Sequence, residues 1–158
     1  MCEYLKTKKD ITKMIILEVG SWAGTSAQVF SEYFKNVICV DPWKPTKGTI
    51  STLYNMDEVE KEFDKVRRKC NNIVKEKARI QDIINNYGDK AFDVIYIDGE
   101  HTYKAVKRDI KLCLPKAKYF ICGHDYWRNK FDGVIKAVDE TLGKPDKVFH
   151  DTSWVKEL

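Results

Sequence analysis

The chain has 158 residues, a length typical of one domain, and 43% of them are hydrophobic, which suffices for a buried core. Its formal net charge of +4 is the balance of 28 basic and 24 acidic residues, so the composition does not predict a nucleic-acid surface. No signal-peptide pattern follows Met1, and no apolar run reaches the roughly 20 residues of a membrane span. The five cysteines include no C-x-x-C pair and are typical of reduced thiols. We therefore expect a cytoplasmic protein of one domain, residues 1–158, with 1–13 as a short N-terminal extension.

Apolar runs alternate with amphipathic segments along the chain. Strands are predicted at Met14–Val19, Val37–Asp41, Asn72–Lys75, Phe92–Asp98, Tyr119–Gly123, Lys147–His150 and Ser153–Lys156. Between them, apolar side chains recur at helical spacing within Ala27–Phe34, Met56–Cys70, Ile80–Tyr87, Tyr103–Leu114 and Ile135–Leu142. This alternation indicates a doubly wound, Rossmann-like α/β fold: a mostly parallel sheet of about seven strands, helices on both faces and an antiparallel last strand.

The first predicted strand runs into a glycine-containing turn. Residues 15–24 read Ile-Ile-Leu-Glu-Val-Gly-Ser-Trp-Ala-Gly, and a helix is expected from Thr25 onwards. Gly20 permits a sharp turn, and the helix N-terminus offers free N–H groups to a nucleotide-like ligand. Asp41 ends the next strand about 20 residues later, where a carboxylate can accept both hydroxyls of a ribose. The plain alternative for Asp41 is a turn acid before proline, and the glycine turn alone equally fits a nicotinamide-binding domain.

Polar side chains also follow two later strands. The fourth strand runs into Asp98-Gly-Glu-His101, and the fifth into Gly123-His-Asp-Tyr126. Ligands of open α/β sheets bind beyond the carboxyl ends of the strands. The sequence therefore predicts a functional site at this edge of the sheet.

These segments resemble class I S-adenosylmethionine-dependent methyltransferases, especially the compact branch similar to macrocin-type sugar O-methyltransferases. The matching segments are Leu17–Ser26, Val40–Trp43, Phe92–Tyr103, Gly123–Tyr126 and Gly133–Glu140. The resemblance implies S-adenosylmethionine as cofactor and a hydroxyl of a sugar or other small molecule as acceptor. The cofactor-binding residues that it implies are Glu18, Gly20, Ser21, Trp22, Gly24, Thr25, Ser26, Asp41, Trp43, Ala78, Arg79, Asp98 and His101.

The resemblance also implies a metal and a base. In the sugar-methylating relatives, acids at two strand ends hold a divalent metal, and an acid two residues after the first ligand is the proposed base. The candidate metal ligands here are Asp98, His124 and Asp125, and the candidate bases are Glu100 and His101. His124 stands where an acid is expected. Because magnesium prefers oxygen ligands, this change favours manganese or no metal.

Two functions remain open: an O-methyltransferase, and a catalytically inactive S-adenosylmethionine-binding module that acts as partner or regulator. The first strand is predicted to start near residue 14, so we expect this chain to lack the helical region with which larger relatives build acceptor pockets. We expect a small acceptor held by loops, or a homo-oligomer that completes the pocket. The long loop Pro42–Asn55 is predicted to be a lid over the cofactor. Lys104, Lys107 and Arg108 alternate with an apolar stripe and indicate a solvated helix face, not a nucleic-acid surface.

Overall fold

One mixed sheet of seven strands organises the molecule. In this computed structural model, which describes residues 1–158, the strand order is β3-β2-β1-β4-β5-β7-β6. The strands are β1 (Ile15–Val19), β2 (Asn36–Val40), β3 (Ile73–Glu76), β4 (Phe92–Ile97), β5 (Ala117–Gly123), β6 (Lys147–Val148) and β7 (Trp154–Glu157). Strands β1 to β5 pair in parallel, whereas β7 runs antiparallel to both β5 and β6. The predicted fold is confirmed, and each strand boundary lies within two residues of its prediction.

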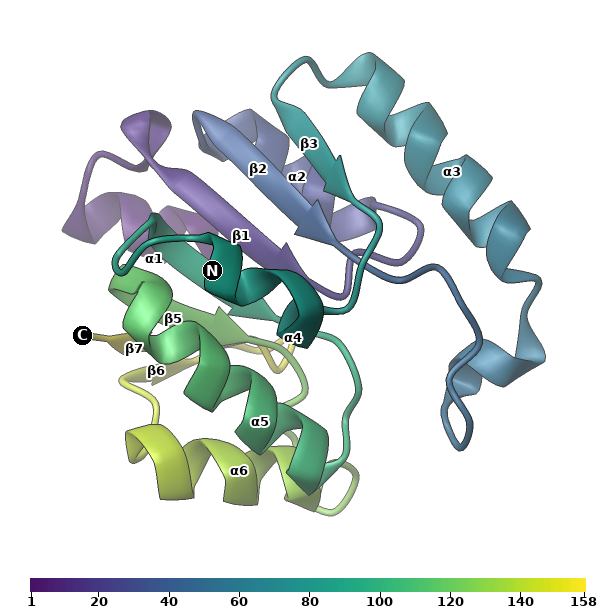
Figure 1. The fold of residues 1–158 in the computed structure, drawn as a ribbon. Helices are drawn as coiled ribbons and strands as arrows, with labels where there is room; N and C mark the ends of the chain where they lie inside the picture. The colour runs from purple at the N-terminus through teal and green to yellow at the C-terminus, as the bar shows by residue number, and fades with distance from the viewer.

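Helices cover both faces of this sheet (Figure 1). They are α1 (Cys2–Lys8), α2 (Thr25–Tyr33), α3 (Met56–Lys69), α4 (Ile80–Ile83), α5 (Tyr103–Cys113) and α6 (Asp132–Leu142). Helices α1, α2 and α3 contribute to one buried apolar cluster, and α4, α5 and α6 to the other. The predicted stripe Ile80–Tyr87 forms only the short α4 and a following 3₁₀ turn, Ile84–Asn86. No helix is long and apolar enough to cross a membrane.

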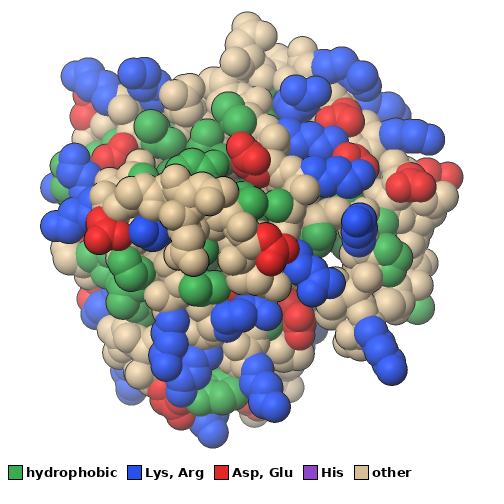
Figure 2. Space-filling view, in the orientation of Figure 1, with side chains coloured by type: hydrophobic (Ala, Val, Ile, Leu, Met, Phe, Trp, Pro, Cys, Tyr) green, Lys and Arg blue, Asp and Glu red, His purple; other side chains and the backbone are tan.

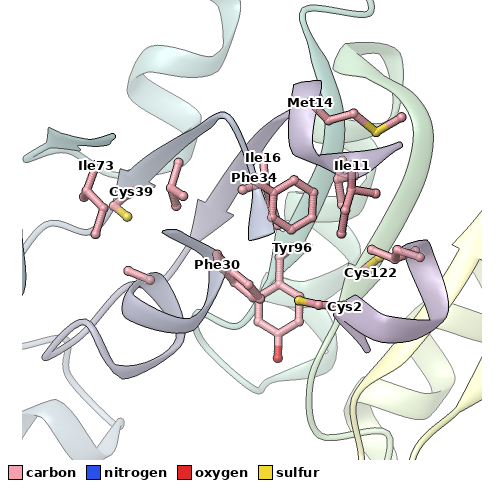
Figure 3. Close-up of a cluster of buried hydrophobic side chains, with 14 of the residues drawn as sticks. Cys2, Ile11, Met14, Ile16, Phe30, Phe34, Cys39, Ile73, Tyr96 and Cys122 are labelled. Atoms are coloured by element: carbon pink, nitrogen blue, oxygen red, sulfur yellow. The ribbon is translucent and has the colours of Figure 1, made fainter. Parts of the chain in front are cut away.

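The short helix α1 has no counterpart in the predicted elements. Leu5 and Ile11 are completely buried, so residues 1–13 pack against the sheet. Figure 3 shows Cys2 and Ile11 in the same cluster as Phe30 and Tyr96, whose rings lie 5.0 Å apart. A seven-residue helix offers too few turns for a periodic apolar pattern to stand out. The core contacts, not the pattern, hold this segment in place.

Backbone hydrogen bonds tie four strand ends together at one edge of the sheet. Gly20 N–H donates to the Val40 carbonyl at 2.8 Å, and Asp98 N–H donates to the Val19 carbonyl at 2.8 Å. His124 N–H donates to the Ile97 carbonyl at 3.2 Å. The segments that follow β1, β2, β4 and β5 therefore start side by side. The strand order reverses between β1 and β4, which is where open α/β sheets form a crevice.

Candidate functional site

The glycine turn after β1 presses directly on the end of β4. Gly20 has a φ of +90°, and a Cβ atom placed there would lie 2.2 Å from the Asp98 carbonyl oxygen. Only glycine can occupy this position, because both the backbone angle and the missing side chain are required. Gly24, at φ +88°, precedes the first turn of α2 and packs against Phe63 of α3.

A buried carboxylate lies beneath this turn. Glu18 is fully buried, and the Ser26 hydroxyl donates a hydrogen bond to its Oε1 atom. Glu18 Oε2 and the buried hydroxyl of Ser21 make no hydrogen bond of good geometry, although Ser21 and Cys39 lie close enough to Glu18 to lower its pKa. Burial raises the pKa of Glu18 to about 7, although the Ser26 hydroxyl acts in the opposite direction. Buried polar atoms are normally paired, so this pair of acceptors fits a ligand that brings an N–H donor, such as the amino group of the expected cofactor.

Asp41 follows β2 and joins the two loops. It is 7% exposed, and its Oδ2 and Oδ1 atoms accept the N–H groups of Trp22 at 3.1 Å and Trp43 at 2.7 Å. Burial raises the pKa of Asp41, and the backbone donors lower it, with a net upward shift. Each carboxylate oxygen has a second lone pair, so Asp41 can still accept a ligand hydroxyl.

The Trp43 side chain, which the resemblance places close to the adenosine, is buried in the structure. It is 1% exposed, and its ring packs against Phe63 with centroids 4.7 Å apart. Its φ of +43° turns the chain inward, a backbone state that a sequence pattern does not reveal. Trp43 therefore packs within the core beside the two loops, and its place close to the adenosine stays a prediction.

A hollow of about 350 Å³ adjoins the segment after β2. Its lining residues are Pro42, Lys44, Lys77, Ala78, Arg79 and Asp82. The structure therefore brings Ala78 and Arg79, both expected at the adenine, next to the loop that carries Asp41. Asp82 is not among the predicted site residues. It lies three residues after Arg79 in the first turn of α4, and this helical spacing is the sequence signal that places the two side chains on one face.

An acid–histidine group lies beyond β4 and β5. Asp98, His101 and Asp125 each offer one atom within 4.8 Å of the others. His101 Nε2 lies 2.9 Å from Asp125 Oδ2 and 3.4 Å from Asp98 Oδ1. Hydrogen bonds to Asp125 and then Asp98 raise the pKa of His101 to about 9. Burial acts to raise the pKa of Asp125, but hydrogen bonds from His101 and His124 hold it well below its usual range.

Two residues predicted for this group lie outside it. His124 Nδ1 contacts Asp125 Oδ1 at 3.2 Å, but the ligand-forming set contains His101 in its place. Glu100 accepts a hydrogen bond from the Thr102 hydroxyl at 2.8 Å, and it is likewise absent from the set. The order of residues in a loop does not say which side chains turn toward one another. Asp125 also has a φ of +60°, a backbone state that residue order does not reveal.

Aromatic side chains border the acid–histidine group on one side. The Phe131 ring lies 5.2 Å from the His101 ring. Trp127 is 47% exposed, and Lys130 Nζ lies 4.2 Å from its ring centroid. Trp154 is fully buried and belongs to the core. Phe131 is thus the aromatic residue that contacts His101, whereas Trp127 lies on the surface and Trp154 in the core.

The surface carries charges of both signs. On the face shown in Figure 2, basic and acidic side chains are interspersed, without a single basic stripe.

Known proteins resemble this chain in sequence family and in fold. A family model described as a methyltransferase domain matches residues 17–126. The O-methyltransferase NovP superposes with a TM-score of 0.68 at 14% identity, covering 99% of this chain and 78% of NovP. CalS11, a TDP-rhamnose 3'-O-methyltransferase of calicheamicin biosynthesis, gives 0.66 at 12% identity, covering 99% and 76%.

A more distant neighbour was solved with a cofactor product. Haemonchus contortus phosphoethanolamine N-methyltransferase 1, in complex with phosphoethanolamine and S-adenosylhomocysteine, gives a TM-score of 0.58 at 11% identity, covering 81% of this chain and 25% of that protein. Across the similar structures, the chain spans between 25% and 83% of the other protein's length. These identities establish the shared fold only. No curated protein sequence matches the chain.

Proposed function

The chain belongs to the methyltransferase family whose domain it matches, and on that premise we propose that it transfers a methyl group from S-adenosylmethionine to a hydroxyl of a small molecule. The observation that carries this proposal is the meeting of two different sites at one sheet edge. The glycine turn with its unpaired buried acceptors lies directly against Asp98, and Asp98 belongs to the acid–histidine group. Cofactor and acceptor would thus be held next to each other.

The first two loops would hold the cofactor. Glu18 Oε2 and the Ser21 hydroxyl would accept hydrogen bonds from the ammonium group of the cofactor. Asp41 would accept hydrogen bonds from the hydroxyls of its ribose. The hollow beside Ala78 and Arg79 would take the adenine. When bound, S-adenosylmethionine supplies an electrophilic methyl group on a sulfonium ion. The main task of the protein in such a reaction is to align acceptor oxygen and methyl group.

The acid–histidine group would take the acceptor proton. His101 Nε2–H donates to the carboxylates of Asp125 and Asp98, so the neutral ring would accept the proton of an acceptor hydroxyl at Nδ1 as its oxygen attacks. Asp98 and Asp125 would stabilise the imidazolium that forms. Because hydrogen bonds to Asp125 and Asp98 raise the pKa of His101 to about 9, the neutral, basic form is a minority at pH 7, and the methylation rate should rise with pH up to about 9. Glu100, turned toward Thr102, is less well placed for this role.

The same three side chains also form a donor set for a divalent cation. Two carboxylates and one imidazole suit manganese better than magnesium, which prefers oxygen ligands. Such a cation would lower the pKa of an acceptor hydroxyl. Manganese should raise the Tm of the wild type but not that of Asp125→Asn. No response of the wild type would remove the metal from the proposal.

Turnover of a panel of hydroxylated sugars and phenols tests the proposal. His101→Gln should lower kcat by about 100-fold or more, the usual effect of losing a general base, with a smaller change in the Kd of S-adenosylmethionine. A larger loss in Glu100→Gln than in His101→Gln would return the base role to Glu100. If the cofactor binds and no acceptor is methylated, the inactive cofactor-binding module is the better account.

A further inference from the structure

Trp43 occupies an unusual position between the two loops that we assign to the cofactor. Its indole Nε1–H donates to the Trp22 carbonyl at 2.8 Å, and its own backbone N–H donates to Asp41 Oδ1. Trp22 N–H in turn donates to Asp41 Oδ2. These three hydrogen bonds form a closed cycle that joins the glycine turn to the segment after β2.

The cycle holds two strained residues. Trp22 has a φ of +47° and Trp43 a φ of +43°, values that bulky side chains rarely adopt and that persist only where the surroundings enforce them. The Trp43 ring packs against Phe63 and also contacts the ammonium group of Lys75, which lies 4.8 Å from the ring centroid. Lys75 is held in turn by Glu60 at 2.7 Å and Asp64 at 2.9 Å.

From this arrangement we propose that Trp43 is a positioning residue for cofactor binding. Its indole N–H anchors the glycine turn, so that Ser21 and the backbone of Trp22 stay in register with the Asp41 carboxylate. The inference rests on the proposed function, because it assumes that these two loops bind S-adenosylmethionine. Trp43 touches no ligand in this role. It acts through Trp22 and Asp41.

Trp154 provides a matched control. It is as deeply buried as Trp43, and its indole N–H also donates to a loop carbonyl, that of His124, at 3.2 Å. That loop lies on the acceptor side. Replacement of either tryptophan by phenylalanine removes one indole hydrogen bond and a similar volume. A merely structural role would therefore affect both variants in the same way.

Calorimetric titration with S-adenosylmethionine is the central measurement. Trp43→Phe should weaken binding about tenfold, whereas Trp154→Phe should stay within about twofold of the wild type; a tenfold change corresponds to one well-placed hydrogen bond. Equal losses in both variants, in proportion to their lost stability, would overturn the inference. If Trp43→Phe is too unstable, site-specific benzothienylalanine at position 43 keeps the ring shape and removes only the N–H group.

Amide hydrogen exchange separates this inference from the proposed function. In Trp43→Phe, exchange at the Trp22 amide should accelerate about tenfold or more relative to amides in β4, with no ligand present. Unchanged exchange at Trp22 would overturn the positioning role. If exchange accelerates but the wild type gives no heat with S-adenosylmethionine, the two loops are coupled as described and the proposed function fails.

Discussion

At the scale of single residues, the site depends on the close approach of two backbones. Gly20 lies against Asp98 at the end of β4, and Asp98 belongs to the acid–histidine group.

Gly20 and Gly48 allow the close contact at the glycine turn to be measured. Both have positive φ, +90° and +83°, but a Cβ atom at Gly20 would strike the Asp98 backbone, whereas nothing lies within 4 Å of Gly48. Gly48→Ala should cost about 1 kcal/mol, the conformational penalty alone. Gly20→Ala should cost several times as much or prevent folding. Urea unfolding of both variants checks this; similar midpoints would contradict the close packing.

Glu18 should make both stability and binding depend on pH. Its folded-state pKa of about 7 lies above the ordinary value of 4.5, so its stabilising contribution is complete below about pH 4.5 and is lost as pH rises through 7. Glu18→Gln should lack this loss, so the variant gains stability relative to the wild type between pH 5 and 7. Unfolding free energies across this range provide the measurement.

The same carboxyl should couple to the cofactor with the opposite sign. An ammonium ligand favours the ionised form, so S-adenosylmethionine should bind the wild type up to about tenfold more tightly per pH unit as pH approaches 7 from below. Calorimetry from pH 5.5 to 7.5 checks this. A pH-independent Kd in the wild type would exclude Glu18 as the group that binds the ammonium.

The sequence indicated which residues stand at the strand ends, because apolar runs stop there. It could not indicate that Trp43 is buried or that His101, rather than His124, joins Asp98 and Asp125. Backbone states such as the positive φ angles at Trp43 and Asp125 do not show in a side-chain pattern.

At the scale of elements, the strands could be predicted from the sequence, whereas helix α1, the end of α4 and the structure of the segment after β2 could not. Every strand was predicted because apolar runs are distinctive, whereas α1 is too short to show a period. The apolar spacing of Ile80–Tyr87 indicated a helix longer than α4, which stops at Ile83. The segment after β2 was expected to be a long loop. It contains a 3₁₀ turn, Ile50–Leu53, and is held by its own hydrogen bonds, among them Thr46 N–H to Ser51 Oγ at 2.8 Å.

This loop should respond to the cofactor as a unit. Leu53 is 80% exposed, and the Tyr54 ring contacts the Trp22 ring of the glycine turn, with centroids 5.4 Å apart. Trypsin should cut after Lys47, and S-adenosylmethionine should slow this cut several-fold if the loop closes over it. Cleavage after Lys90, which precedes β4 at the opposite edge of the sheet, is the control. Equal rates at Lys47 with and without cofactor would count against a lid.

At the scale of the whole molecule, the strand order decides which loops meet. Residues separated by more than 100 positions, from Glu18 to Asp125, converge because β1 lies between β2 and β4, and β5 follows β4. The glycine turn alone was equally compatible with a nicotinamide-binding domain. The match to a methyltransferase domain over residues 17–126 decides between these two families, because no single motif distinguishes them.

Ligand-induced stabilisation distinguishes the two cofactors. At a concentration 100 times its Kd, S-adenosylmethionine should stabilise the protein by about 2.7 kcal/mol, which corresponds to a Tm increase of roughly 5–10 °C for a chain of this size. NAD should give no increase. A thermal shift with NAD and none with S-adenosylmethionine would falsify the cofactor assignment.

The pairing of β7 with β5 has a consequence for synthesis on the ribosome. Strand β7, residues 154–157, is synthesised after β6 but lies between β5 and β6 in the sheet. The edge of β5 and the carbonyl of His124 therefore have no hydrogen-bond partner until these residues have been synthesised. Until then, a nascent chain exposes an unpaired apolar strand edge, the feature that most readily recruits chaperones or neighbouring chains. Ribosome-stalled chains that end before Trp154 should therefore be more dependent on chaperones than chains extended past residue 157.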